Sequence, residues 1–249
     1  MVCWIVIPFT LSAISLIGSW TVYGLAVSYK HVCPLSNWKY TDVCHPNASE
    51  QCCTDGNMPM ISSCGKNPPE NSLFTATFNA AAVLFLIFCI CQHAHILDKN
   101  SNYALLSKAN LAIGCLAAFG AFVTGNCNPV HVRWLHYLGA ALGFVCLCFY
   151  TLILTILTSK CFITGLERFL APLRIILTVV QALSTIFYVV FFVQPEYNYK
   201  HMSAICEWTL STNIQLFELT YVAEFYYFSS SMLSVLIHKR DEEKSLILS

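Results

Sequence analysis

The chain has 249 residues, of which 57% are hydrophobic and only 10% are charged, with 13 basic and 13 acidic side chains. Together with a mean hydropathy of +0.62, this shortage of charge excludes an ordinary water-soluble globular domain. The formal net charge of zero gives no electrostatic basis for binding nucleic acid.

Five stretches contain no Asp, Glu, Lys or Arg: residues 1–29, 71–97, 109–132, 134–159 and 175–195. Each reaches the ~20 residues with which a helix crosses ~30 Å of hydrocarbon. A sixth apolar run, from Trp208 to about Val235, is broken only by Glu218 and Glu224. The predicted fold class is therefore all-α, a polytopic membrane protein with a six-transmembrane-helix bundle. The predicted spans are about 3–28, 73–95, 109–127, 135–158, 174–194 and 208–235.

The segment between the first two predicted spans, residues 30–71, is rich in cysteine. It holds Asn47 in an N-x-Ser triplet and five of the 14 cysteines, namely Cys33, Cys44, Cys52, Cys53 and Cys64. Disulfides and N-glycans form in non-cytosolic compartments. The connections on the other side of the membrane carry eight Lys and Arg against five on this side, a bias that favours the cytosol. We therefore expect a disulfide-rich first extracellular loop, with both termini and the tail 239–249 in the cytosol.

The stretch CICQHAH, residues 89–95, has the composition of a metal site. On a helix, however, residues two apart lie ~200° apart around the axis, so Cys89 and Cys91 face different ways. Only two of these side chains can share a face, whereas structural zinc takes four ligands. We therefore predict buried thiols and interfacial histidines, with no metal. No nucleophile or nucleotide-binding motif occurs either, so we expect no enzyme and no cofactor.

Small residues recur at packing spacing in the third and fourth predicted spans. Gly114 pairs with Ala118, and Gly139 pairs with Gly143. Such steps allow helix backbones to approach closely, so these two helices are predicted to pack together.

Glu218 is the most unusual residue of the predicted spans. It lies ten residues beyond Trp208, or ~15 Å along a helix, near the bilayer midplane. A carboxylate there is costly unless it is paired, hydrated or protonated. Two interpretations stay open. One is a protonated carboxyl bonded to Asn79, Asn110 or Gln181, and the other is an ion or proton pathway.

The predicted cytosolic segments are short. Lys160, Arg168 and Arg174 mark the cytosolic side and could contact anionic lipid at ~1 kcal/mol each. In the tail, the sequence from Glu242 to Leu246 and Ile247 fits an acidic dileucine pattern, which is a sorting address.

Several short motifs follow one another along the whole chain. They are CPLSNW (33–38), PMISSCG (59–65), PPENSLF (68–74), VTGN (123–126), HYLGAALGF (136–144), SAICEW (203–208) and AEF (223–225). In this order and spacing the chain resembles the family of damage-regulated autophagy modulators and transmembrane protein 150. Within that family it is most similar to the subtype-A branch of transmembrane protein 150.

The resemblance implies a non-enzymatic membrane regulator with membrane lipids as partners and no nucleic acid. The subtype-A branch implies the plasma membrane and the recruitment of the phosphatidylinositol 4-kinase complex or its membrane adaptors, and hence control of phosphoinositide levels. Other branches imply endosomes or lysosomes and autophagy. A channel or transporter subunit that uses Glu218 is a further alternative. The signature positions Asn126, His136, Glu207 and Trp208 are expected to be structural, at the outer interface.

The odd number of loop cysteines calls for a partner elsewhere. Cys127, just outside the third predicted span, and Cys206, at the outer end of the last, are the candidates. We expect two disulfides within the loop and a third that joins it to the bundle, with a free thiol as the alternative. Six cysteines allow 15 connectivities, so no specific pairs are predicted.

Overall fold

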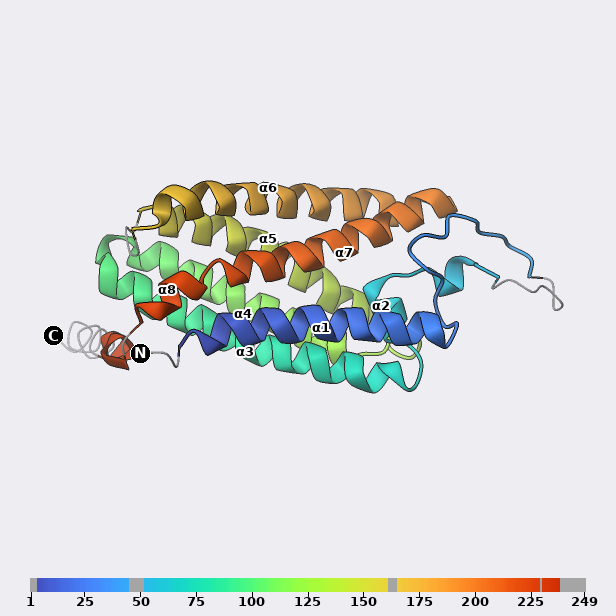
Figure 1. Cartoon of the computed structure of the whole chain (residues 1–249), viewed down its shortest axis with the longest axis horizontal. Coiled ribbons are helices and arrows are strands. Elements are labelled where there is room, and N and C mark those ends of the chain that lie inside the picture. Colours follow the sequence, from blue (N-terminus) through green and yellow to red (C-terminus); the bar gives the residue numbers. More distant parts are fainter. Residues whose placement is uncertain (1–3, 45–51, 161–164, 229, 238–249) are drawn as a thin grey trace.

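The computed structural model describes residues 4–44, 52–160, 165–228 and 230–237. Its long helices lie side by side along one axis (Figure 1). The α-helices are α1 (Val6–Ser28), α2 (Ile61–Cys64), α3 (Glu70–Lys99), α4 (Ala104–Asn126), α5 (Arg133–Lys160), α6 (Glu167–Phe192), α7 (Tyr197–Leu219) and α8 (Val222–Tyr226). Three 3₁₀ turns complete the order, η1 (Asp55–Asn57), η2 (Ser101–Tyr103) and η3 (Ser230–Leu233). These ranges contain no strand, which confirms the all-α prediction.

The bundle has two different ends. Residues 30–69, which connect α1 to α3 and are called the loop from here on, cover one end, the loop end. α1 begins and α8 lies at the opposite end, called the tail end (Figure 1). Where the connection between two long helices is short, as in residues 127–132 and 193–196, the two helices run in opposite directions.

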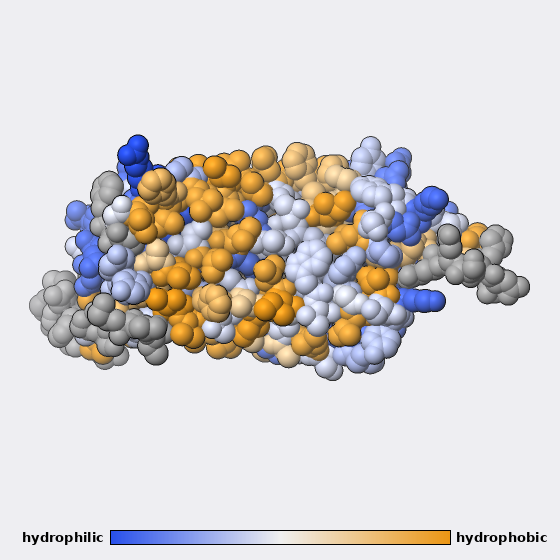
Figure 2. Space-filling model, viewed as in Figure 1, coloured by the Kyte–Doolittle hydropathy of each residue, from blue (hydrophilic) through white to orange (hydrophobic). Residues whose placement is uncertain are grey.

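The surface is that of a membrane protein. Five helices of the described residues, α1, α3, α4 with the preceding η2, α5 and α6, are long and apolar enough to cross a bilayer. Figure 2 shows hydrophobic residues over the middle of the bundle and hydrophilic residues towards both ends. Large apolar side chains remain exposed on these helices, among them Ile17, Phe119 and Ile186. Because helices satisfy their own backbone hydrogen bonds, such a surface is stable in lipid.

The sixth predicted span differs from the helix observed. α7 begins at Tyr197, well before the predicted start at Trp208, and ends at Leu219. The chain then turns at Thr220 and Tyr221 before the short α8. α7 carries many polar residues and is not among the five candidate spans. It nevertheless packs along α6 and α1 within the bundle. The sixth span is therefore neither confirmed nor contradicted, and the count of six stays a prediction.

The predicted contact between the third and fourth spans is confirmed, since α4 and α5 pack more extensively than any other helix pair. A Cβ atom on Gly120 would lie 2.5 Å from the backbone N of Gly143 and 2.7 Å from the carbonyl O of Gly139. Real side chains do not tolerate such distances, so the two helices meet backbone to backbone through these glycines.

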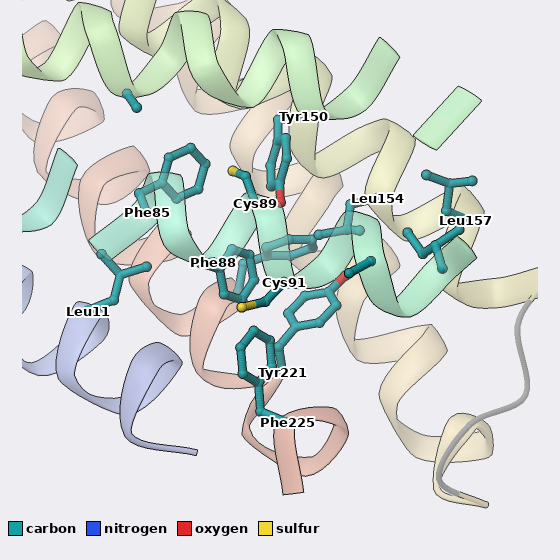
Figure 3. Close-up of a cluster of buried hydrophobic side chains, with 14 of the residues drawn as sticks. Leu11, Phe85, Phe88, Cys89, Cys91, Tyr150, Leu154, Leu157, Tyr221 and Phe225 are labelled. Carbon is teal, nitrogen blue, oxygen red and sulfur yellow. The ribbon is translucent and has the colours of Figure 1, made fainter. Parts of the chain in front are cut away.

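The core towards the tail end is aromatic. Figure 3 shows side chains of α1, α3, α5 and α8 that converge there, together with Tyr221 of the turn between α7 and α8. Phe88 of α3 is fully buried, and its ring stacks on that of Phe225 with centroids 5.4 Å apart. Tyr221 meets Phe88 edge-on at 5.5 Å. The break between α7 and α8 therefore turns two large rings inward onto α3, and this contact positions the end of the last helix.

Candidate functional site

Two disulfides give the loop its shape. They join Cys33 to Cys53 and Cys44 to Cys52, as expected for the two bonds within the loop. Cys64, Cys127 and Cys206 carry free thiols, so the expected third disulfide is not formed. Cys64 is fully buried, and this burial raises the pKa of its thiol.

Hydrogen bonds from α7 join the loop to the bundle in place of a third disulfide. The backbone N–H of Ile61 donates to the Glu207 carboxylate at 2.9 Å, and the indole N–H of Trp208 donates to the carbonyl O of Pro59 at 2.9 Å. Both α7 side chains are buried. Each satisfies a backbone group that the loop would otherwise bury without a partner. Glu207 and Trp208 are thus structural residues of the loop end, as the family motif implies.

His201, near the start of α7, makes a second connection between the loop and the bundle. The tyrosine OH of Tyr40 lies 2.6 Å from His201 Nδ1, and His201 Nε2 lies 3.0 Å from the carbonyl O of Leu35. A carbonyl oxygen can only accept, so Nε2 of His201 carries the proton. In the neutral imidazole Nδ1 is then unprotonated and accepts a hydrogen bond from the Tyr40 hydroxyl. Burial raises the pKa of Tyr40 to about 12, which keeps its hydroxyl proton in place.

The other two signature residues brace the helix ends beside the loop. His136 of α5 is buried, and its Nδ1 donates to the carbonyl O of Cys127 at 2.7 Å. Asn126 at the end of α4 donates to Asn79 of α3 at 2.6 Å. All four signature positions therefore lie in the loop-end half of the bundle and hold backbone or neighbouring helices.

An ion pair at the tail end was not foreseen from the sequence. Arg174 of α6 pairs with Glu224 of α8, donates to the hydroxyl of Thr220 at 2.9 Å and to the Thr220 carbonyl at 3.0 Å, and lies 3.7 Å above the Tyr221 ring. Its side chain is only 4% exposed. The possible contact of Arg174 with anionic lipid is therefore not made, because the side chain turns inward. The guanidinium instead satisfies the carbonyl that the end of α7 leaves free.

None of the three partners expected for Glu218 bonds it. Asn79 bonds Asn126, and Gln181 accepts from Asn213 at 2.9 Å. Asn110 makes no hydrogen bond to Glu218, and its Oδ1 is buried without a partner among the described residues. Glu218 is 4% exposed, and no hydrogen bond or ion pair in the described part of the chain reaches its carboxyl group. Glu218 is the penultimate residue of α7, a helix that begins at Tyr197 and not at Trp208. Glu218 lines an internal cavity of about 160 Å³.

The cysteines and histidines of residues 89–95 do not gather around one point. His93 bonds Ser107 at 2.8 Å, and the ring of His95 lies over that of Phe228 at 4.3 Å. Among the described residues, no three His, Cys, Asp or Glu side chains are placed to hold a metal ion. The glycosylation candidate Asn47 and the sorting-motif residues Glu242, Leu246 and Ile247 lie outside the described residues.

Comparisons with known proteins cover almost the entire chain. The Frag1/DRAM/Sfk1/Cwh43P N-terminal domain family matches residues 3–228. Transmembrane protein 150A of mouse is 35% identical over 238 residues, which are 94% of this chain and 88% of that protein. Modulator of macroautophagy TMEM150B-A of Xenopus laevis is 29% identical over 91% of this chain and 88% of its own length. Human DNA damage-regulated autophagy modulator protein 1 is 25% identical over 68% of this chain and 77% of its own length. No solved structure matches.

Proposed function

Because the chain belongs to the Frag1/DRAM/Sfk1/Cwh43P family, in which its relatives are multi-pass membrane proteins, we propose that it is a non-enzymatic regulator at the plasma membrane. In this proposal it promotes recruitment of the phosphatidylinositol 4-kinase complex, directly or through membrane adaptors, and so sets the local level of phosphoinositides. The tail end faces the cytosol, where that kinase acts, and the loop end faces outside.

The observation that carries this proposal is the likeness to transmembrane protein 150A. The human protein is 35% identical over 94% of this chain, and the Xenopus laevis protein is 34% identical over 90%. The family match over residues 3–228 spans all the long helices and the loop. The regulatory role itself is what the subtype-A resemblance implies.

The surface of the bundle offers a basic and aromatic pair at each end, and this makes the proposal testable. At the start of α6, at the tail end, Arg168 is exposed beside Phe169, which is 72% exposed. At the start of α5, at the loop end, Arg133 is exposed beside Trp134, which is 69% exposed. A cytosolic complex can contact only the pair at the tail end. An aromatic residue and an arginine are also the side chains most often enriched at protein contacts.

The test is a rescue experiment in cells that lack the protein. Wild-type chain is expected to restore the kinase and phosphatidylinositol 4-phosphate at the plasma membrane, both measured by fluorescent reporters. The double variant Arg168→Ala, Phe169→Ala is expected to lose most of this rescue. The matched control Arg133→Ala, Trp134→Ala removes the same side-chain types at the other end and is expected to rescue fully. Failure of the wild-type chain to change either reporter would end the proposal.

A second function is favoured by other relatives. The names TMEM150B-A and DNA damage-regulated autophagy modulator protein 1 both refer to autophagy. With the dileucine pattern Glu242, Leu246 and Ile247 as a sorting address, the alternative is an endosomal or lysosomal modulator of autophagy. The double variant Leu246→Ala, Ile247→Ala separates the two functions. Under the alternative it leaves endolysosomes and alters autophagic flux, whereas an unmoved variant argues for the kinase-linked function at the plasma membrane.

A further inference from the structure

The cavity lies inside the bundle and reaches from the loop towards the tail half. Its lining comes from α1, α3, α4, α5, α6, α7 and the loop residues that precede α3. One wall is apolar and is built from α3, α4 and α5. It includes Phe74, Phe78, Phe85, Ala117, Phe144 and Leu147. Rings and small side chains of this kind form a smooth surface for hydrocarbon.

The opposite wall is a polar stripe on α7. Glu207, Ser211, Gln215 and Glu218 follow one another at intervals of three or four residues, so they share one face of the helix. From Glu207 to Glu218 the helix rises about 16 Å, which makes this wall elongated along the bundle axis. The cavity therefore has an apolar side and a polar side along its length.

Two acceptors on this stripe have no partner within the described ranges. Gln215 is 6% exposed and its Oε1 receives no hydrogen bond. The Glu218 carboxyl group, one helical turn further on, is likewise without a bond or an ion pair. Both groups are more than nine-tenths buried and belong to residues that line the cavity. Buried acceptors are normally satisfied, so this site lacks a donor.

The chemistry of these groups restricts the missing molecule. A carboxylate in a site of low dielectric is best matched by a cation, and a cation that also donates to an amide oxygen must carry several N–H groups. Lys66 is the only basic side chain among the lining residues other than His136, and it lies on the loop, not beside Glu218. Lys66 also repels a positive head group from the loop end. An anionic lipid head beside Glu218 is excluded by like charge.

The size of the cavity restricts the apolar part. An engineered apolar cavity of about 150 Å³ accepts one benzene-sized molecule. A cavity of about 160 Å³ that is drawn out along a helix therefore accepts one short alkyl chain of about six carbon atoms. Two acyl chains or a four-ring sterol would exceed it.

We propose that this cavity binds a primary amine that carries one short alkyl chain. The ammonium donates to the Glu218 carboxylate and to Gln215 Oε1, and the alkyl chain lies against the phenylalanine and alanine wall towards the loop. This site is independent of the proposed kinase-linked function, which concerns the tail-end surface.

The test uses the full-length chain in nanodiscs of uncharged phosphatidylcholine. A short primary alkylamine that carries a diazirine and a terminal alkyne along its chain is crosslinked, and the labelled peptides are mapped by mass spectrometry. Unlabelled hexylamine, hexanol and hexanoate serve as competitors, because they share one chain and differ only in the head group. Crosslinks are expected on α3 and α7 peptides that line the cavity. The amine is expected to compete about tenfold better than the alcohol, with hexanoate weakest.

Glu218→Gln preserves the size of the side chain and removes its charge. It is expected to lower amine labelling about tenfold and to abolish the preference for amine over alcohol. The matched control Glu196→Gln removes a carboxylate from the exposed start of α7 and is expected to label like wild type. Equal competition by alcohol and amine, undiminished labelling of Glu218→Gln, or crosslinks confined to the lipid-facing surface would each overturn the proposal. The competition series needs no variant, so it decides the question even if Glu218→Gln does not fold.

Discussion

The indole N–H of Trp208 donates a hydrogen bond to the carbonyl oxygen of Pro59, 2.9 Å away, and so joins α7 to the loop. The two residues are 149 positions apart in the sequence. The Trp208 ring also packs on Trp20 of α1, with centroids 4.6 Å apart. A single side chain of α7 therefore connects the loop, the first helix and the last long helix. Buried polar contacts of this kind hold the loop on the bundle, and no disulfide joins the two in the described part of the chain.

Trp208→Phe is expected to weaken this joint. Phenylalanine keeps much of the aromatic packing but leaves the buried Pro59 carbonyl without its donor, at a cost of about 1–3 kcal/mol in the free energy of unfolding. The effect is measured as the melting temperature of the purified protein. Unfolding is monitored by the fraction that still elutes as a monodisperse species after heating. Thr209→Val is the control, because the Thr209 hydroxyl bonds only a carbonyl of its own helix. Equal melting temperatures for both variants would show that the bond does not stabilise the loop.

The Arg174 and Glu224 side chains are expected to behave as a coupled pair. Removing either partner leaves a buried charge and should cost about 3–5 kcal/mol in the free energy of unfolding. The double variant Arg174→Met, Glu224→Leu leaves no buried charge, so it should be more stable than either single variant. Unfolding measurements on all four proteins form a double-mutant cycle. Strictly additive effects would contradict a direct interaction.

The glycines between α4 and α5 predict a contrast with a glycine of α1. Gly120→Ala places a methyl group against the backbone of α5 and is expected to destabilise the fold by about 1–3 kcal/mol. A Cβ on Gly24 meets no atom within 4 Å, so Gly24→Ala should be neutral or slightly stabilising. Thermal unfolding of the two variants beside wild type provides the comparison. A stable Gly120→Ala protein would mean that the helices do not touch there.

The cysteines give a prediction that mass spectrometry can check directly. Digestion without reductant should release peptides linked through Cys33–Cys53 and through Cys44–Cys52. Cys64, Cys127 and Cys206 should all react with an alkylating reagent once the protein is unfolded. In the folded protein Cys64 should react the slowest of these three from about pH 7 to about pH 9. The reason is that burial raises the pKa of its thiol and only the thiolate reacts. A linked peptide that contains Cys127 or Cys206 would restore the third disulfide first expected from the sequence.

The sequence predicts five of the long helices well because each corresponds to a stretch without charged residues. It misplaces the start of α7, since Lys200 and Glu207 suggest a solvent-exposed connection. In the structure Lys200 instead pairs with Asp55 at 2.7 Å, and Glu207 accepts from Ile61. Those partners lie in the loop, more than 140 residues away, so no local sequence pattern around α7 could predict them.

The site shows the same limit. The oddity of Glu218 is visible in the sequence, because carboxylates are rare in apolar runs. Its surroundings are not, because the cavity is lined by residues from six long helices and α2 that only the packing brings together. The pairing of Arg174 with Glu224 is missed for a related reason. A count of positive residues predicts which side of the membrane an arginine marks, and says nothing about whether it turns inward.

The proposed function requires the loop end to lie outside the cytosol, and one labelling measurement tests this orientation. Sealed, right-side-out plasma-membrane vesicles are treated with an amine reagent that cannot cross the bilayer, and the labelled lysines are mapped. Lys39 in the loop and Lys160 at the tail end of α5 are both exposed, so each reacts if the reagent reaches it. If the protein has this orientation, Lys39 is labelled at once and Lys160 only after the vesicles are opened. Labelling of Lys160 in sealed vesicles, with Lys39 protected, would contradict it.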